Sequence, residues 1–130
     1  KDIPASRVKD VVFGYTVAND VTAVAHDKVR AKCFDTSSPI GPVIETDIDV
    51  SDLRLVSRVN GEERKAGSTA SLAFTVADLV AYASTIFTLL PGDIILTGAP
   101  AGTGEIEAGQ VVEVECEGIG SLRNPVLRRD

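Results

Sequence analysis

The stretch from residue 53 to residue 61 reads Leu53-Arg54-Leu55-Val56-Ser57-Arg58-Val59-Asn60-Gly61. Its side chains alternate in character from one residue to the next, the two-residue period of a half-buried strand. Asn60 and Gly61 then supply two neighbouring residues that tolerate positive φ, which the type I′ turn of a tight hairpin needs. The stretch therefore predicts a β-hairpin that turns at Asn60.

The segments on either side of this hairpin predict more β-structure. Residues 13–17 carry aromatic and β-branched side chains and lead to the polar pair Asn19-Asp20, so we expect a strand with Asp20 at its end. Residues 94–96 form a short apolar run before a glycine-rich turn, which is typical of a buried strand. Residues 111–117 alternate apolar with acidic side chains and predict a half-exposed strand.

Two short helices are expected. Pro4 suits a first helical turn, and Val8, Val11 and Val12 have the spacing of one buried helical face. Thr75 can cap a second helix together with Asp78, and Pro91-Gly92 is expected to end it. The second helix has an apolar stripe of helical period: Val76, Leu79, Val80, Ala83, Phe87 and Leu90.

The fold class that follows is α+β and mainly β, because the strands do not alternate regularly with helices as a doubly wound parallel sheet requires. No internal repeat or linker divides residues 1–130, which predicts a single domain. The chain has 130 residues, of which 44% are hydrophobic, but no apolar run is long enough to cross a membrane. Lys1 stands where an initiator methionine would be, so we interpret the chain as part of a longer protein.

Charge and cysteine content exclude several classes of function. The net charge of −6 comes with no dense basic stripe, which argues against nucleic acid as a partner. Cys33 and Cys116 match no Cys-x-x-Cys pattern, so neither a disulfide framework nor a zinc site is indicated, and a cytoplasmic location fits. Residues 97–104 are rich in glycine but lack the Gly-Lys-Ser/Thr ending of a phosphate-binding loop, which argues against a nucleotide site.

Three residues could carry chemistry. A carboxylate at the position of Asp20, near a sheet edge, needs a cation, a metal or hydrogen-bond donors nearby, although a turn or capping aspartate is the alternative. The ammonium of Lys32 could pair with a group in a cleft or extend to solvent from a strand. His26 is expected to be a surface loop residue, since it and the adjacent Asp27 would point opposite ways in an extended segment.

Five motifs resemble, in order and spacing, the C-terminal part of the catalytic domain of the fumarylacetoacetate hydrolase family. The resemblance covers nearly the whole chain. The motifs are FGYTVANDVTA (13–23), KCFDT (32–36) with PIGP (39–42), VNGE (59–62), TLLPGDIILTG (88–98), and EGIG (117–120) with Leu122 and NPV (124–126).

The resemblance implies a roll of mixed β-sheets and an enzyme that depends on Mg²⁺ or Mn²⁺. Asp20 would be one of three carboxylate ligands, and the other two would form a Glu-x-Glu pair on a strand upstream of the first helix. Lys32 would be catalytic and would also bind substrate, with Thr36 and Gly98 as further substrate-binding residues. The fixed ammonium of Lys32 would stabilise the charge of an enolate as it develops.

The implied substrates are small 2-oxo acids and β-diketo acids. Hydrolysis of acylpyruvates, decarboxylation of oxaloacetate and isomerisation of 2-hydroxymuconate-type compounds could all proceed through a metal-stabilised enolate, for example in the catabolism of aromatic compounds. The family also implies a homodimer.

The chain departs from the family pattern in ways that keep a second hypothesis open. Val24 replaces a substrate-binding arginine, Ala99 replaces the second threonine of a Thr-Gly-Thr-Pro turn, and the stretch between Ala23 and Arg30 is short. The upstream Glu-x-Glu strand, and a lid with an acid/base histidine and glutamate, are not present. The alternative is therefore a non-catalytic member or fragment that keeps the fold and acts as a binding or assembly module.

Overall fold

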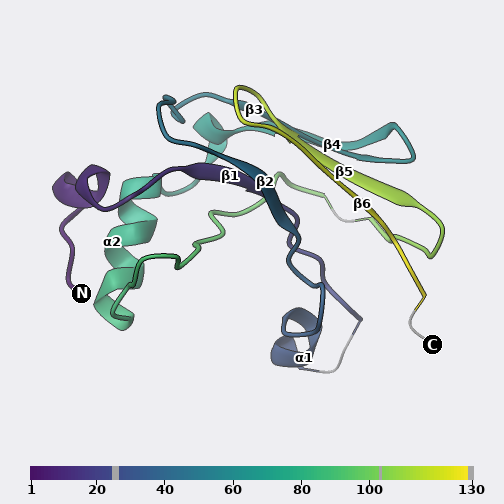
Figure 1. The fold of residues 1–130 in the computed structure, drawn as a ribbon, viewed down its shortest axis with the longest axis horizontal. Coiled ribbons are helices and arrows are strands. Elements are labelled where there is room, and N and C mark those ends of the chain that lie inside the picture. The colour runs from purple at the N-terminus through teal and green to yellow at the C-terminus, as the bar shows by residue number, and fades with distance from the viewer. Residues whose placement is uncertain (25–26, 103, 129–130) are drawn as a thin grey trace.

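The computed structural model describes residues 1–24, 27–102 and 104–128. Figure 1 shows two β-sheets with a separate helix, α2 (Val76–Ile86), beside them. The larger sheet has the order β4-β3-β5-β6 and the smaller one pairs β1 with β2, all of them antiparallel. The strands are β1 (Tyr15–Ala18), β2 (Ile40–Glu45), β3 (Arg54–Val59), β4 (Glu62–Ser68), β5 (Val111–Cys116) and β6 (Gly120–Pro125). The α+β, mainly β class is confirmed.

The β3–β4 hairpin forms where the sequence predicts it. Asn60 and Gly61 both have positive φ, +51° and +86°, as a type I′ turn requires. Asn60 also fastens the turn to the next strand, because its N–H donates to the carbonyl oxygen of Val111 and its Oδ1 accepts the N–H of Val111, both at 2.9 Å. The hairpin is therefore anchored to β5.

The core lies on one face of the four-stranded sheet, which β1 crosses. Val17 from β1 packs there against Val114, Cys116 and Leu122, with Leu55 partly buried beside them. Burial of a valine or leucine side chain contributes about 1.5–3 kcal/mol, so this layer stabilises the fold. Cys116 is a free buried cysteine and Cys33 a free exposed one.

Helix α2 begins as predicted and ends earlier. Thr75 and Asp78 form a complete capping box, in which each side chain accepts the backbone N–H of the other residue at 3.1 Å. The helix ends at Ile86, because Phe87 has extended backbone with ψ of 151°. Pro91 and Gly92 do not end the helix but form a separate turn, closed by the N–H of Asp93 donating to the carbonyl oxygen of Leu90 at 3.0 Å.

Three other expectations need correction. The strand expected at residues 94–96 is absent, since no described segment pairs with it. The helix expected at the start of the chain is a 3₁₀ segment, η1 (Ala5–Asp10). Besides α2, the structure has one further α-helix, α1 (Lys28–Lys32), which the sequence analysis did not predict. A short 3₁₀ turn, η2 (Thr69–Ser71), is also present. Lys32 lies at the end of α1 and not in a strand. No helix within the described ranges has the length and apolar character needed to span a bilayer.

Candidate metal and substrate site

Asp20 lies two residues beyond the end of β1, in a segment held against α1 and the turn that follows it. Three backbone hydrogen bonds of 2.9–3.0 Å fix this arrangement. They run from the N–H of Asn19 to the carbonyl oxygen of Pro39, from Val21 to Ser37, and from Ala23 to Ala31. The path of the chain thus carries Asp20 to the segment that contains Lys32 and Thr36.

Asp20 and Lys32 form an ion pair. The Nζ atom of Lys32 is 2.6 Å from Oδ2 of Asp20, and the side chains are 42% and 45% exposed respectively. Helix α1 positions the lysine: Oδ1 of Asp27 accepts the N–H of Arg30 at 2.8 Å and caps the helix, which places Lys32 in its last turn. A carboxylate and an ammonium therefore meet at a place that solvent and small molecules can reach.

Thr36 belongs to the same neighbourhood and has an unusual backbone. It is exposed and has a φ of +66°. The next residue, Ser37, is buried, and its carbonyl oxygen accepts the N–H of Val21. Positive φ in a β-branched residue costs on the order of 1–3 kcal/mol, and residues held in this way are concentrated at functional sites.

The described contacts do not bring Gly98 to this pair. Gly98 has a φ of +117°, and a Cβ atom added there would meet only Cδ2 of Leu72, at 4.0 Å. Val24 is fully exposed, and Ala99 is exposed as well. His26 lies outside the described residues. The structure thus gathers three of the four predicted site residues, Asp20, Lys32 and Thr36, on neighbouring segments.

Asp20 could serve as a single ligand of a divalent metal ion. Its carboxylate is half-exposed and is a hard oxygen donor, the type of ligand that Mg²⁺ and Mn²⁺ prefer. Across the part of the chain that the structure describes, no three His, Cys, Asp or Glu side chains lie close enough together to hold an ion. The other ligands of a tight site are not supplied by these residues.

A Glu-x-Glu pattern that sequence reasoning did not single out lies on β5. Glu113 and Glu115 both bind Nη1 of Arg58 on β3, at 2.9 Å and 2.5 Å. Their carboxylates, with Glu115 as the main contributor, raise the pKa of the Arg58 guanidinium. The alternation of acidic and apolar residues in 111–117 was the available signal. Both glutamates form ion pairs with Arg58. Within the described part of the chain, they do not form a group of metal-ligating side chains together with Asp20.

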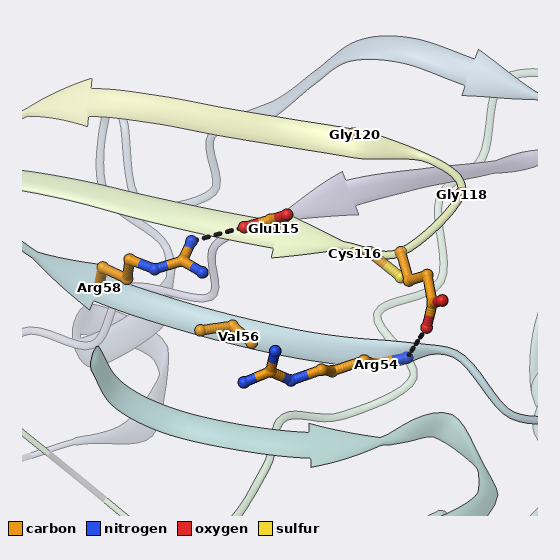
Figure 2. A pocket seen from close by; sticks show the side chains of 8 residues that line it. Arg54, Val56, Arg58, Glu115, Cys116, Gly118 and Gly120 are labelled. Carbon is orange, nitrogen blue, oxygen red and sulfur yellow. Dashed lines mark hydrogen bonds and ion pairs between the residues drawn. The ribbon is translucent and has the colours of Figure 1, made fainter. Parts of the chain in front are cut away.

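Figure 2 shows the hollow beside this ion-pair network, with a volume of about 380 Å³. Val56 lies between Arg54 and Arg58 on β3, and Glu115 faces Arg58 across the strands. The side chain of Glu117 accepts the backbone N–H of Arg54 at 3.2 Å. Because the opposite charges here bind one another across β3 and β5, we assign this polar face a structural role.

Known proteins match the chain over nearly all of its length. The family model described as fumarylacetoacetate (FAA) hydrolase C-terminal matches residues 1–127. An uncharacterized protein of Methanocaldococcus jannaschii is 49% identical over 97% of this chain and 55% of its own length. This chain spans about half the length of the curated relatives that it matches.

Two solved structures show the same backbone. The 5-carboxymethyl-2-hydroxymuconate delta-isomerase of Mycobacterium smegmatis is 46% identical, with a TM-score of 0.96 over 100% of this chain and 54% of its own. The maleylpyruvate hydrolase of Sphingobium sp. SYK-6, in complex with manganese(II) ion and pyruvate, is 32% identical, with a TM-score of 0.92 over 100% of this chain and 50% of its own. The chain belongs to the fumarylacetoacetate hydrolase family.

Proposed function

We propose that this chain forms part of a divalent-metal-dependent enzyme that acts on small 2-oxo acids or β-diketo acids. The candidate reactions are hydrolysis of an acylpyruvate, decarboxylation of oxaloacetate and isomerisation of a 2-hydroxymuconate-type compound. The observation that carries the proposal is the ion pair between Asp20 and Lys32 at the end of β1. It combines a hard oxygen ligand with a fixed positive charge in a site open to solvent.

Each residue of the pair has a distinct role in this proposal. Asp20 would contribute one ligand to Mg²⁺ or Mn²⁺, and the cation when bound would polarise the keto group of the substrate as a Lewis acid. Lys32 would hold Asp20 in place and stabilise negative charge on the substrate through its ammonium. Thr36 would offer its exposed hydroxyl to the substrate, and Gly98 would let the substrate approach the backbone closely.

The two solved relatives support this class of reaction. One is named an isomerase of a hydroxymuconate, and the other is a maleylpyruvate hydrolase in complex with manganese(II) ion and pyruvate. Both names describe acids of the kind proposed here. We further infer a cytoplasmic homodimer, and the free thiols of Cys33 and Cys116 agree with a reducing compartment.

The direct test uses the intact protein with Asp20→Ala and Asp20→Asn. We expect both variants to lose Mn²⁺-dependent turnover of oxaloacetate or an acylpyruvate, because neither offers a charged oxygen ligand. Asp47→Asn is the matched control, since Asp47 is an exposed aspartate outside the site. Full turnover in both Asp20 variants would remove Asp20 from the reaction.

A non-catalytic binding or assembly module is the second candidate. The observation that favours it is Val24, a fully exposed apolar side chain at the position where the family resemblance implies a substrate-binding arginine. This reading predicts that the intact protein has no turnover with any of these acids, and that Asp20→Ala leaves its binding of partners unchanged. If the wild-type protein turns over one of these acids and the turnover depends on added Mn²⁺, the enzyme hypothesis is correct and the non-catalytic module is excluded.

A further inference from the structure

The pairing of β1 with β2 (Figure 1) is irregular in the middle of β1. Tyr15 pairs with Glu45, and Val17 pairs with Gly41. The one residue between these pairs on β1, Thr16, therefore faces three residues of β2. A regular antiparallel ladder matches residues one to one, and a bulge interrupts its backbone bonds. The register of the two strands thus changes at Thr16.

The side chain of Thr16 bridges this interruption. Its Oγ1 donates to β2 and lies 2.7 Å from the carbonyl oxygen of Val43 and 3.2 Å from that of Gly41. Pro42, between these two residues, has no N–H to contribute to the ladder. The hydroxyl therefore supplies a bond between the strands at the point where backbone pairing is weakest.

The register beyond the bulge determines where Asp20 lies. The pairing continues past the end of β1, where the N–H groups of Asn19 and Val21 each donate to a carbonyl oxygen of the segment 37–39 at 3.0 Å. Asp20 lies between these two bonds. Any change of register after Thr16 would therefore move its carboxylate relative to the segment that follows Lys32.

Burial alone does not fix this register. Between the pairs formed by Tyr15 and Val17, β2 has two residues more than β1. If β1 slipped by two residues, each side chain would keep its side of the sheet, because the side-chain period of a strand is two. Val17, which is 3% exposed, would still face the core, whereas Asp20 would move by about 7 Å along its partner.

The ion pair with Lys32 is also too weak to hold Asp20 in place. The two side chains are 42% and 45% exposed, and exposed ion pairs contribute little to stability. A bond within the strand pair is a better candidate for this task, and the hydroxyl of Thr16 forms one at the bulge itself.

We propose that Thr16 is a positioning residue: the bond from its hydroxyl to the carbonyl oxygen of Val43 fixes the register in which β1 places Asp20 beside Lys32. The hydroxyl acts through the backbone of β1 and touches neither metal nor substrate. This inference rests on the proposed function in one respect, because it treats the Asp20–Lys32 pair as the reacting site. The register itself can be measured without turnover.

The experiment compares three variants of the full 130-residue chain. Thr16→Val removes the hydroxyl and keeps the branched Cβ, whereas Thr16→Ser keeps a hydroxyl and serves as the rescue variant. Thr85→Val is the matched control, because it removes a threonine hydroxyl that donates to the carbonyl oxygen of Tyr82 at 2.8 Å, away from the strands.

Amide hydrogen exchange measures the register directly. Exchange at Asn19 and Val21 should be about tenfold faster in Thr16→Val than in the wild type, as expected when one hydrogen bond is lost. Thr16→Ser and Thr85→Val should exchange like the wild type at both positions. Exchange in β3 and β5 is the internal reference and should not change. Equal acceleration there would mean that Thr16 supports the whole fold, which would overturn the inference.

Chemical coupling measures the position of Asp20. A water-soluble carbodiimide joins a carboxylate to an amine as an amide only where the two groups are in contact, and mass spectrometry of the digested chain detects the link from Asp20 to Lys32. The initial rate of this coupling should fall at least about threefold in Thr16→Val, because the exposed pair cannot hold the segments together. Thr16→Ser and Thr85→Val should couple at the wild-type rate.

Kinetics of the intact protein complete the test. In Thr16→Val, kcat for Mn²⁺-dependent turnover should fall at least about tenfold and by a larger factor than KM rises, since misplaced groups slow the chemical step. Thr16→Ser should restore it. Wild-type exchange and coupling in Thr16→Val would overturn the inference, and so would an unchanged kcat. A wild-type protein without turnover would refute the proposed function, while exchange and coupling would still decide the role of Thr16.

Discussion

The half-exposed state of Asp20 and Lys32 decides what their ion pair can contribute. Exposed ion pairs stabilise proteins by about 0–1 kcal/mol, because water already solvates both charges. The short Nζ to Oδ2 distance of 2.6 Å therefore matters for position more than for stability.

We therefore expect Lys32→Gln to change function without changing stability. The free energy of unfolding, from urea titration, should shift by less than about 1 kcal/mol. Mn²⁺-dependent turnover by the intact protein should fall, because the charge that stabilises the substrate anion is lost. Lys28→Gln, at the other end of α1, is the control and should change neither quantity. A large loss of stability in Lys32→Gln would show that the pair is structural.

Ser84 is the residue for which we predict the reverse, an effect on stability alone. Its Oγ is fully buried, donates to the carbonyl oxygen of Ala81 and accepts the N–H of Ile3. Ser84→Ala leaves that N–H unpaired, which should lower the free energy of unfolding by about 1–3 kcal/mol. Thr85→Ala removes a similar bond, to Tyr82, from an exposed position and should cost clearly less. Equal losses in the two variants would contradict the role given to Ile3.

Residue-level roles were the hardest to predict from sequence. From local sequence patterns alone, Asp20 could equally be a turn or capping residue, and Lys32 could equally extend to solvent. Only the family resemblance indicated that the two residues belong to one site. The physical reason is that their contact depends on how the segments 19–23 and 31–39 pair, which no periodicity encodes. Ser84 gave no signal, because its partner Ile3 is 81 residues away and a serine within a helix is unremarkable.

At the scale of elements, the capping box of α2 makes helix stability depend on pH. The hydroxyl of Thr75, followed by its backbone N–H, lowers the pKa of Asp78 below the usual 3.8. A pKa that is lower in the folded state stabilises that state above the unfolded pKa, and this contribution is lost as pH falls through the folded value. We expect Asp78→Asn to reduce the loss of thermal stability between about pH 5 and about pH 2. Asp47→Asn is the control and should show the same dependence of thermal stability on pH as the wild type. If Asp78→Asn also shows the wild-type dependence, the capping box does not cause the loss of stability at low pH.

Two elements with strong local signals were predicted correctly. The Asn60-Gly61 hairpin and the Thr75 cap are local and are confirmed. The strand at 94–96 has the right residues but no hydrogen-bonded neighbour, so that prediction was wrong. Strand β2 was missed because it contains Pro42, and proline is tolerated in a sheet chiefly on an edge strand, which is where β2 lies.

At the scale of the whole molecule, the chain combines exposed large apolar side chains with a single proposed metal ligand, Asp20. The family model matches residues 1–127, and the chain spans about half the length of its relatives. Phe87 and Leu90 are more than 60% exposed, and the carboxylate of Asp20 stands beside the ammonium of Lys32. Among the described residues, no group of three metal-ligating side chains includes Asp20.

The 130-residue chain alone should bind a divalent cation only weakly. Affinity for hard divalent cations rises with the number of charged oxygen ligands, and Asp20 supplies one that is already paired with an ammonium. Calorimetric titration with Mn²⁺ should therefore give a dissociation constant of about 1 mM or weaker. Lys32→Gln should strengthen this weak binding, since it removes the competing cation, and Asp20→Asn should abolish it. Micromolar affinity in the isolated chain would mean that its own residues form a complete metal site.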